Sequence, residues 1–465
     1  MAPSPTGEYH IGHIRTVLYN IAFAKKHHGK FIIRIEDTDR VRLVEGAIDR
    51  ILDDIRDYGF SWDEGPRVGG DFGPYIQSER LPLYKKYAEE LIEKKAAYYC
   101  FCTAERLAQM RETQRAQKVA STKYDKHCLH LSTEEIEKKL AAKEPYVIRL
   151  NVQPNKIISF TDAVFGQISI NSNEIDDQIL LKSDGFPTYH LGVVVDDHLM
   201  EITHVMRGND WIPSTPKHIL IYEAFGWELP TYIHLPNLKE LGADKKLSKR
   251  HGPVSAREFL DAGYLSKALI NFLMLLGWNP GTEQEIYSFD EFIKSFELTK
   301  IHKTDLVAFD RQKLTWMNGF YIREMSVEAL TRTLLTYYAK SGEDKELKKI
   351  DETMLLKIVQ LAQSRINTLK EFYPLVRHFL PGSQFIVSKD TMEIARSLQN
   401  ELDRIRIWNT DSILDALREV LKSHSIRMPV LYTIITGQER GLPLPESLEI
   451  LGKEEALSRL RIALS

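Results

Sequence analysis

The chain has 465 residues, with 62 Lys plus Arg, 65 Asp plus Glu and a formal net charge of −3. This length suggests about two to four domains with several hydrophobic cores. The charge excludes a protein that binds nucleic acid through an overall basic surface, so any RNA contact has to come from local basic patches. No apolar run is long enough to span a bilayer, and the first residues lack the features of a signal peptide. We therefore expect a cytoplasmic protein with no membrane partner.

The first hundred residues alternate between helical and strand patterns. Apolar spacing predicts helices at 14–28, 45–58 and 81–95, and a β-rich composition predicts a parallel strand at 30–35. This alternation is typical of an α/β fold that binds ligands at the carboxyl ends of its strands. The pattern breaks at about Tyr98, and we interpret 98–190 as an insertion between two halves of the sheet. The elements expected next are a charged helix at 133–143 and strands at 146–152, 192–195 and 202–206.

Beyond about Asp261 the periodicity becomes helical. After Trp316-Met317-Asn318-Gly319 there is no β-rich block and no internal repeat, so we expect the rest of the chain to be all α. The helices expected here lie at 265–276, 327–341, 351–369, 390–404 and 411–423. The pattern predicts an α/β catalytic body followed by a helical region.

A motif near the N-terminus points to a nucleotide. Ala2-Pro3-Ser4-Pro5-Thr6-Gly7 runs into His10-Ile11-Gly12-His13. Two histidines at a helix start are, on their own, more often surface or capping residues than catalysts. Here a turn of prolines and glycine precedes them, Thr6 can cap the helix, and Gly12 lets the backbone approach a phosphate. Histidines so placed can donate hydrogen bonds to an anion that the helix dipole already favours.

A second motif, Lys246-Leu247-Ser248-Lys249-Arg250, lies far downstream. A solvated basic loop is the default interpretation of such a charge run. Gly242 and Gly252-Pro253 hinge this loop on both sides, however. A reaction at the α-phosphate of a nucleotide needs stabilisation of negative charge on that phosphate and on the leaving pyrophosphate, which a basic loop can supply.

All three cysteines fall within residues 100 to 128. An odd number, clustered in this way, argues against disulfides and for a metal site in a reducing compartment. Cys100-x-Cys102 and Cys128-x-His130 are spaced more tightly than a generic zinc finger, but three thiolates and one imidazole would make a closed structural zinc site. His127 competes with His130 as the fourth ligand, and a zinc-free relic packed by neighbouring aromatic residues is the alternative.

The two nucleotide motifs and the cysteine pairs, in this order, resemble bacterial glutamyl-tRNA synthetases of the first class of aminoacyl-tRNA synthetases. The resemblance runs from Ala2 to about Leu464. It implies a Rossmann-like catalytic domain with a zinc-bearing insertion, followed by an all-α anticodon-binding region. The implied catalytic domain has a first half at 1–97 and a second half at 191–240, with the acceptor-binding insertion between them at 98–190. A stem-contact region at 241–320 and the anticodon-binding region at 321–465 follow.

The resemblance also assigns roles to individual residues. The implied catalytic residues are His10, His13, Lys246 and Lys249. ATP, accompanied by Mg²⁺, is expected to contact the same four residues and also Gly12, Asp210, Ser248 and Arg250. The implied glutamate-binding residues are Ala2, Ser4, Glu36, Tyr189, Val193 and Arg207. Of these, Ser4 and Glu36 resemble a pair that holds the ammonium group. Tyr189 and Arg207 resemble residues that read carboxylates, although Arg207 could equally form a surface salt bridge.

The remaining assignments concern zinc and tRNA. The resemblance implies one structural Zn²⁺, ligated by Cys100, Cys102, Cys128 and His130. Arg365 resembles an arginine that reads the third anticodon base and rejects the glutamine tRNA, a task that suits bidentate hydrogen bonding. The expected partners are tRNA(Glu), L-glutamate and ATP, and the expected state is a monomer.

The reaction that the resemblance implies is ligation of glutamate to tRNA. ATP and glutamate give glutamyl-adenylate and pyrophosphate, and a terminal ribose hydroxyl of the tRNA then attacks to give glutamyl-tRNA and AMP. Adenylate formation is expected to require tRNA. Three alternatives are a glutaminyl-tRNA synthetase, whose β-barrel tail the helical pattern disfavours, a queuosine-glutamylating paralogue, which lacks the tail, and a non-catalytic RNA-binding or regulatory derivative.

One departure concerns the start of the sequence. In this family a short strand, ending in an arginine that reads the side-chain carboxylate, directly precedes the Ala2–Gly7 turn. Here the sequence opens at Met1-Ala2. We therefore expect Met1 to be an internal methionine of the native reading frame, and the chain as given to fold poorly and bind glutamate weakly.

Overall fold

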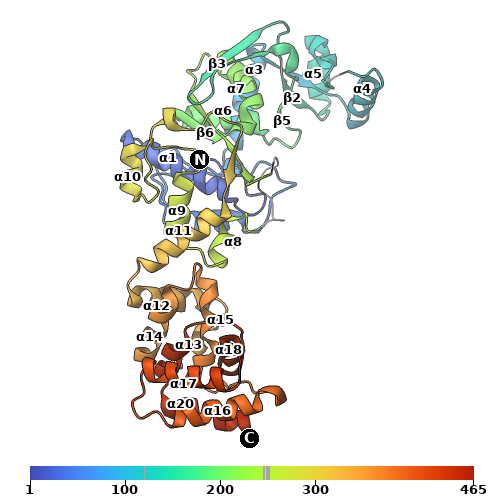
Figure 1. Cartoon of the computed structure of the whole chain (residues 1–465). Helices are drawn as coiled ribbons and strands as arrows, with labels where there is room; N and C mark the ends of the chain where they lie inside the picture. The colour runs from blue at the N-terminus through green and yellow to red at the C-terminus, as the bar shows by residue number, and fades with distance from the viewer. Residues whose placement is uncertain (120, 244–246, 248–251) are drawn as a thin grey trace. The chain divides into compact units, whose positions relative to one another are not determined.

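A computed structural model describes residues 1–119, 121–243, 247 and 252–465 of the chain, which form two compact units (Figure 1). Unit 1 comprises Met1–Arg257 and Ile270–Phe309, and unit 2 comprises Glu258–Leu269 and Asp310–Ser465. Lys246, Ser248, Lys249 and Arg250 of the second nucleotide motif lie outside the described residues. Within the described part of the chain, no helix is both long and apolar enough to cross a membrane.

Helix α1 (Ile11–Lys26) positions the first nucleotide motif in unit 1. Its buried apolar positions recur every three or four residues, at Ile11, Ile14, Val17, Leu18, Ile21 and Ala22. Buried polar contacts add to this packing, because Arg15 donates to the carbonyl of Leu276 at 3.1 Å and the Tyr19 hydroxyl donates to that of Met274 at 3.1 Å. The helix axis, and with it the direction of the helix N-terminus, is therefore fixed by both kinds of contact.

The strands described in unit 1 form three small sheets. One is antiparallel and contains β1 (Ala97–Cys100), β2 (Val147–Leu150) and β5 (Ile179–Leu181). The second has the order β4 (Gly166–Asn171), β3 (Ile157–Asp162), β7 (Thr231–Leu235), β6 (His204–Gly208), and the third pairs β8 (Asn237–Glu240) with β9 (Leu306–Phe309). In the second sheet β7 is parallel to both β3 and β6, so the carboxyl ends of these three strands meet at one edge.

The other helices that lie wholly in unit 1 are α2 (Ala47–Asp57), α3 (Leu81–Glu93), α4 (Ala104–Ala116), α5 (Thr133–Ala141), α6 (Tyr189–Leu199), α7 (Thr215–Phe225) and α10 (Phe289–Ser295). Helices α8 (Ala256–Asp261) and α9 (Ser266–Met274) each contain residues of both units.

The structure corrects the strand prediction at 192–195, because these residues lie inside helix α6. Every residue from Leu191 to Asp197 is buried, and a helix buried on all sides produces the same continuous apolar run as a buried strand. The strand expected at 202–206 is β6, shifted to His204–Gly208. The strand expected at 30–35 is reduced to an extended segment with single bridges from Ile32 to Glu64 and from Ile35 to Ile76.

The regular elements described in unit 2 are all helices, as the periodicity predicts (Figure 1). Its helices are α11 (Arg311–Arg323), α12 (Val327–Ala339), α13 (Asp344–Leu347), α14 (Glu352–Gln363), α15 (Phe372–Val376), α16 (Met392–Asp403), α17 (Thr410–Ser423), α18 (Met428–Thr436), α19 (Leu444–Leu451) and α20 (Lys453–Leu464). The expected helix at 351–369 ends earlier, at Gln363, whose side-chain amide donates to the carbonyls of Ile322 and Met325. That early end places Arg365 in an exposed turn.

Candidate nucleotide and amino-acid site

Part of the first nucleotide motif pairs with the segment that follows the second motif in unit 1. The N–H of Ile11 donates to the carbonyl of Val254 at 2.9 Å, and the N–H of Ala256 donates to the carbonyl of Tyr9 at 2.7 Å. His10 and Ser255 form the antiparallel bridge between these two bonds. The chain that follows the basic Lys246–Arg250 motif is therefore tied to the N-terminus of α1.

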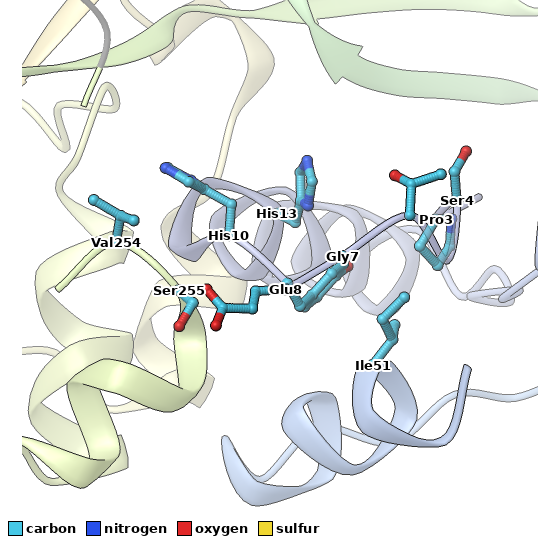
Figure 2. Close-up of a pocket in the computed structure, with 11 residues that line it drawn as sticks. Pro3, Ser4, Gly7, Glu8, His10, His13, Ile51, Val254 and Ser255 are labelled. Carbon is cyan, nitrogen blue, oxygen red and sulfur yellow. The ribbon is translucent and has the colours of Figure 1, made fainter. Parts of the chain in front are cut away.

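A cavity of about 470 Å³ lies at this junction (Figure 2). Residues from both segments and from α2 line it: Pro3, Ser4, Thr6, Gly7, Glu8, Tyr9, His10, His13, Ile51, Val254 and Ser255. Figure 2 shows the imidazoles of His10 and His13 extending to the same side of the chain, and their ring centroids are 6.3 Å apart. A helix N-terminus with two imidazoles beside it is suited to bind an anion such as a phosphate chain.

His10 is both the cap of α1 and a wall of this cavity. Its Nδ1 accepts a hydrogen bond from the N–H of Gly12 at 3.0 Å, so a neutral His10 carries its proton on Nε2. Burial lowers the pKa of His13, and Asp210, in the short helix η4 (Asn209–Ser214), opposes the shift. Of the described residues expected to bind ATP, His10 and His13 line the cavity and Gly12 lies between them in α1.

The structure gives a second reason for glycine at position 12, beside the one inferred from the sequence. A Cβ added at Gly12 would lie 3.2 Å from Nδ1 of His10 and 3.6 Å from Cδ1 of Leu238. The capping ring of His10 therefore occupies the space that a side chain would need. From the sequence, Gly12 was expected to let the backbone approach a phosphate. The packing of the His10 ring against position 12 could not be inferred from the sequence.

Glu36 lies in a buried cluster of charged groups in unit 1. Arg34 donates to Glu36 at 3.1 Å and to Asp197 at 2.9 Å, and its Nε lies 3.5 Å from Asp196. Burial raises the pKa of Glu36 to about 7, although Arg34 opposes the shift. A buried carboxylate with so high a pKa is stabilised in its ionised form when a cation binds next to it. The ammonium group of an amino acid is such a cation.

Three further side chains converge on Asp196 at the base of this cluster. Arg80 and Gln77 each donate to Asp196 at 2.8 Å, and the Tyr84 hydroxyl donates at 2.9 Å. Sequence reasoning missed this network. Its only signal was a pair of acidic residues at the end of an apolar run that had been predicted as a strand.

Tyr189 and Arg207 contact each other, with Nη1 of Arg207 donating to the Tyr189 hydroxyl at 3.0 Å. Trp211, which sequence reasoning missed, lies against Tyr189 with ring centroids 4.4 Å apart. The structure places the other expected amino-acid residues differently. Ser4 lines the cavity, Ala2 is half-buried two residues before it, and Val193 is a residue of α6 that is buried in a hydrophobic core.

The three cysteines lie together in unit 1, as the sequence predicts. Their sulfur atoms are all within 4.8 Å of one another, and those of Cys102 and Cys128 are 3.5 Å apart. Sulfurs that share a tetrahedral zinc ion lie about 3.8 Å apart, so the three thiols fit that ion. Arg149 lies over the ring of Tyr124, 4.2 Å from its centroid, which places a buried cation beside the cluster.

The fourth position of the cysteine cluster is less simple. His130 ends the short helix η2 (His127–His130), and both His130 and the competing His127 are exposed. The Tyr124 hydroxyl instead lies 3.4 Å from the sulfur of Cys100 and 3.2 Å from that of Cys102. Ligation by His130 stays a prediction.

The fold and the cavity define a nucleotide-binding α/β unit followed by a helical unit, the arrangement of a class I aminoacyl-tRNA synthetase. The family of class I tRNA synthetases for E and Q matches over its catalytic domain at residues 1–316, and an anticodon binding domain matches residues 328–464. The chain belongs to this family of class I tRNA synthetases.

Individual relatives agree with this assignment over nearly all of their length. The chain is 44% identical to a glutamate–tRNA ligase of Clostridium tetani, covering 100% of this chain and 96% of the relative. It is 41% identical to one of Clostridioides difficile, covering 99% of this chain and 97% of the relative. A crystal structure of a glutamate tRNA ligase from Elizabethkingia meningosepticum, in complex with its amino acid, has a TM-score of 0.84 and 34% identity, and covers 100% of this chain and 98% of that chain.

Proposed function

We propose that the chain is a glutamate–tRNA ligase that activates L-glutamate with ATP and transfers it to the 3′-terminal ribose of tRNA(Glu). Full-length similarity to glutamate–tRNA ligases supports the activity. The observation that carries the chemistry is the pairing of Tyr9–Ile11 with Val254–Ala256. It joins the first nucleotide motif to the segment that follows the second, and residues of both segments line one cavity.

In this proposal each described residue has one task. His10 and His13 donate hydrogen bonds to the phosphates, and Gly12 leaves room for the His10 ring that caps α1. Asp210 binds the nucleoside part of ATP, which enters with Mg²⁺. Lys246 and Lys249 stabilise the negative charge that develops on pyrophosphate, and Ser248 and Arg250 are further contacts. All four residues lie outside the described part of the chain.

The amino acid is proposed to bind between the acidic cluster and Arg207. Ser4 and Glu36 hold the ammonium group, and Tyr189 and Arg207 hold a carboxylate through charge-assisted hydrogen bonds. Ala2 and Val193 contribute through the backbone and the core, respectively. The cysteine cluster is proposed to hold one structural Zn²⁺, and Arg365 to read the anticodon. We also propose that the protein is a monomer. A cytoplasmic location fits the three free cysteines, because the cytoplasm is a reducing compartment.

Amino-acid-dependent exchange of pyrophosphate into ATP tests the activity. We expect exchange with glutamate in the presence of tRNA, and little with glutamine or without tRNA. Exchange that occurs with glutamine but not with glutamate would reject the proposal and indicate a glutaminyl-tRNA synthetase.

A further inference from the structure

Arg207 is held by three groups of the protein. Its Nε donates to Nε2 of His234 at 3.1 Å, its Nη1 donates to the Tyr189 hydroxyl, and its Nη2 donates to Oγ1 of Thr215 at 2.8 Å. A guanidinium has five N–H groups, so the contacts made by described residues leave one N–H on each terminal nitrogen. Two such groups match the two oxygens of a carboxylate.

The same contacts fix the proton of His234. Arg207 can only donate, so Nε2 of His234 accepts and carries no proton. Nδ1 of His234 lies 2.7 Å from Oδ2 of Asp162, and an ionised carboxylate only accepts, so the proton is on Nδ1. Burial lowers the pKa of His234, although Asp162 opposes the shift, and the ring stays neutral.

Asp162 is held as firmly as the histidine that it orients. Its Oδ1 accepts from the N–H groups of Val164 at 2.9 Å and Phe165 at 2.8 Å, and its Oδ2 also accepts from the N–H of His234 at 3.1 Å. The side chains of both Asp162 and His234 are 0% exposed. The strands set the order of the three groups, since Arg207 on β6 stands opposite His234 on β7, next to the end of β3.

We propose that Asp162 and His234 form a buried relay that positions Arg207 for the carboxylate of the amino-acid substrate. His234 is a positioning residue in this relay, because it acts through Arg207. With its proton on Nε2, or with both nitrogens protonated, His234 would face Arg207 donor to donor and turn the guanidinium away. The inference rests on the proposed function, in which Arg207 binds a carboxylate of glutamate.

Steady-state kinetics of the full chain test the relay through the Michaelis constants for glutamate and ATP. We expect His234→Leu to raise the KM for glutamate about tenfold or more, because a hydrogen bond to a charged group is lost, and to leave the KM for ATP unchanged. His234→Gln should recover most of this loss, because its amide oxygen can accept from Arg207. His378→Gln, a change at a buried histidine of unit 2, is the matched control and should leave both constants unchanged.

A second measurement reads the proton directly. Nitrogen-15 NMR of labelled histidine should show His234 protonated on Nδ1 in the unaltered chain. In Asp162→Asn the amide oxygen is engaged by the N–H groups of Val164 and Phe165, so its NH₂ faces Nδ1 and moves the proton to Nε2. The KM for glutamate should rise in this variant too.

The outcomes separate the relay from the function on which it rests. An unchanged KM for glutamate in Arg207→Lys would overturn the role of Arg207 in the proposed function. A raised KM in Arg207→Lys with an unchanged KM in His234→Leu would overturn the relay alone. Equal loss in His234→Leu and His234→Gln, or His234 protonated on Nε2 in the unaltered chain, would also overturn the relay.

Discussion

Nδ1 of His10 accepts a hydrogen bond from the N–H of Gly12 at 3.0 Å, and this bond joins the start of α1 to the wall of the nucleotide cavity. The imidazole that caps the helix is therefore an imidazole that lines the cavity. Its orientation depends on the absence of a side chain at position 12, because an added Cβ would lie 3.2 Å from Nδ1. The motif is thus a packing unit as well as a chemical one.

Gly12→Ala tests this relationship. We expect the added methyl group to tilt the His10 ring and to lower kcat/KM for ATP about tenfold or more, because small misplacements at a reacting phosphate are costly. Activation kinetics at varied ATP measure the effect. Gly29→Ala is the matched control, since its added Cβ would meet nothing closer than 3.7 Å. Wild-type kinetics in Gly12→Ala would contradict the packing account.

Glutamate binding should depend on pH through Glu36. Burial raises the pKa of Glu36 to about 7, whereas the substrate ammonium pairs with the ionised carboxylate. Below pH 7 the free protein holds Glu36 protonated, and binding then has to release a proton, so affinity falls by at most about tenfold per pH unit as pH decreases. Calorimetric titration in buffers of different ionisation enthalpy measures both the affinity and the released proton.

Glu36→Gln is the control for this dependence. The variant should bind glutamate more weakly at pH 8 and lose most of the dependence between pH 6 and 8. The same slope in the variant would assign the titration to another member of the cluster, such as Asp197, whose pKa burial also raises.

The cysteine cluster should hold one zinc ion per chain. We expect Cys102→Ser and Cys128→Ser to lose the ion and to lower the melting temperature, because structural zinc contributes directly to folding. Elemental analysis of purified protein measures the stoichiometry. His130→Ala is predicted to weaken zinc retention against a chelator, with the exposed His127→Ala as its control. Full retention in His130→Ala would give the fourth position to another group, and Tyr124→Phe then tests the hydroxyl that lies nearest the sulfurs.

Arg365 should contribute to the choice of tRNA. It is exposed in the turn after α14, which ends at Gln363 and not at 369 as the sequence predicted. We expect Arg365→Gln to relax discrimination between anticodons ending in C and G by about tenfold, the effect of losing one bidentate base contact. Charging rates on the glutamate and glutamine tRNAs measure the ratio. Arg418→Gln, at another exposed arginine of unit 2, is the control and should keep it.

The sequence was most informative where chemistry depends on residue type and spacing. The structure confirms the position of His10 and His13 at a helix start, the proximity of the three cysteines and the helical last part of the chain, while the roles of these residues stay predictions. Helix α6 was missed because Val193 to Val195 are β-branched and buried on every side, so their pattern has no period to distinguish helix from strand. The relay of Asp162 and His234 was invisible for a different reason, since its members come together only through strand register.

The most direct test of the account is aminoacylation of purified tRNA by the full chain with labelled amino acids. We predict that the chain charges tRNA(Glu) with glutamate in an ATP-dependent reaction that releases AMP and pyrophosphate, and that glutamine is not a substrate. Charging of glutamine onto its own tRNA, or tRNA binding with no charging of either amino acid, would contradict the account.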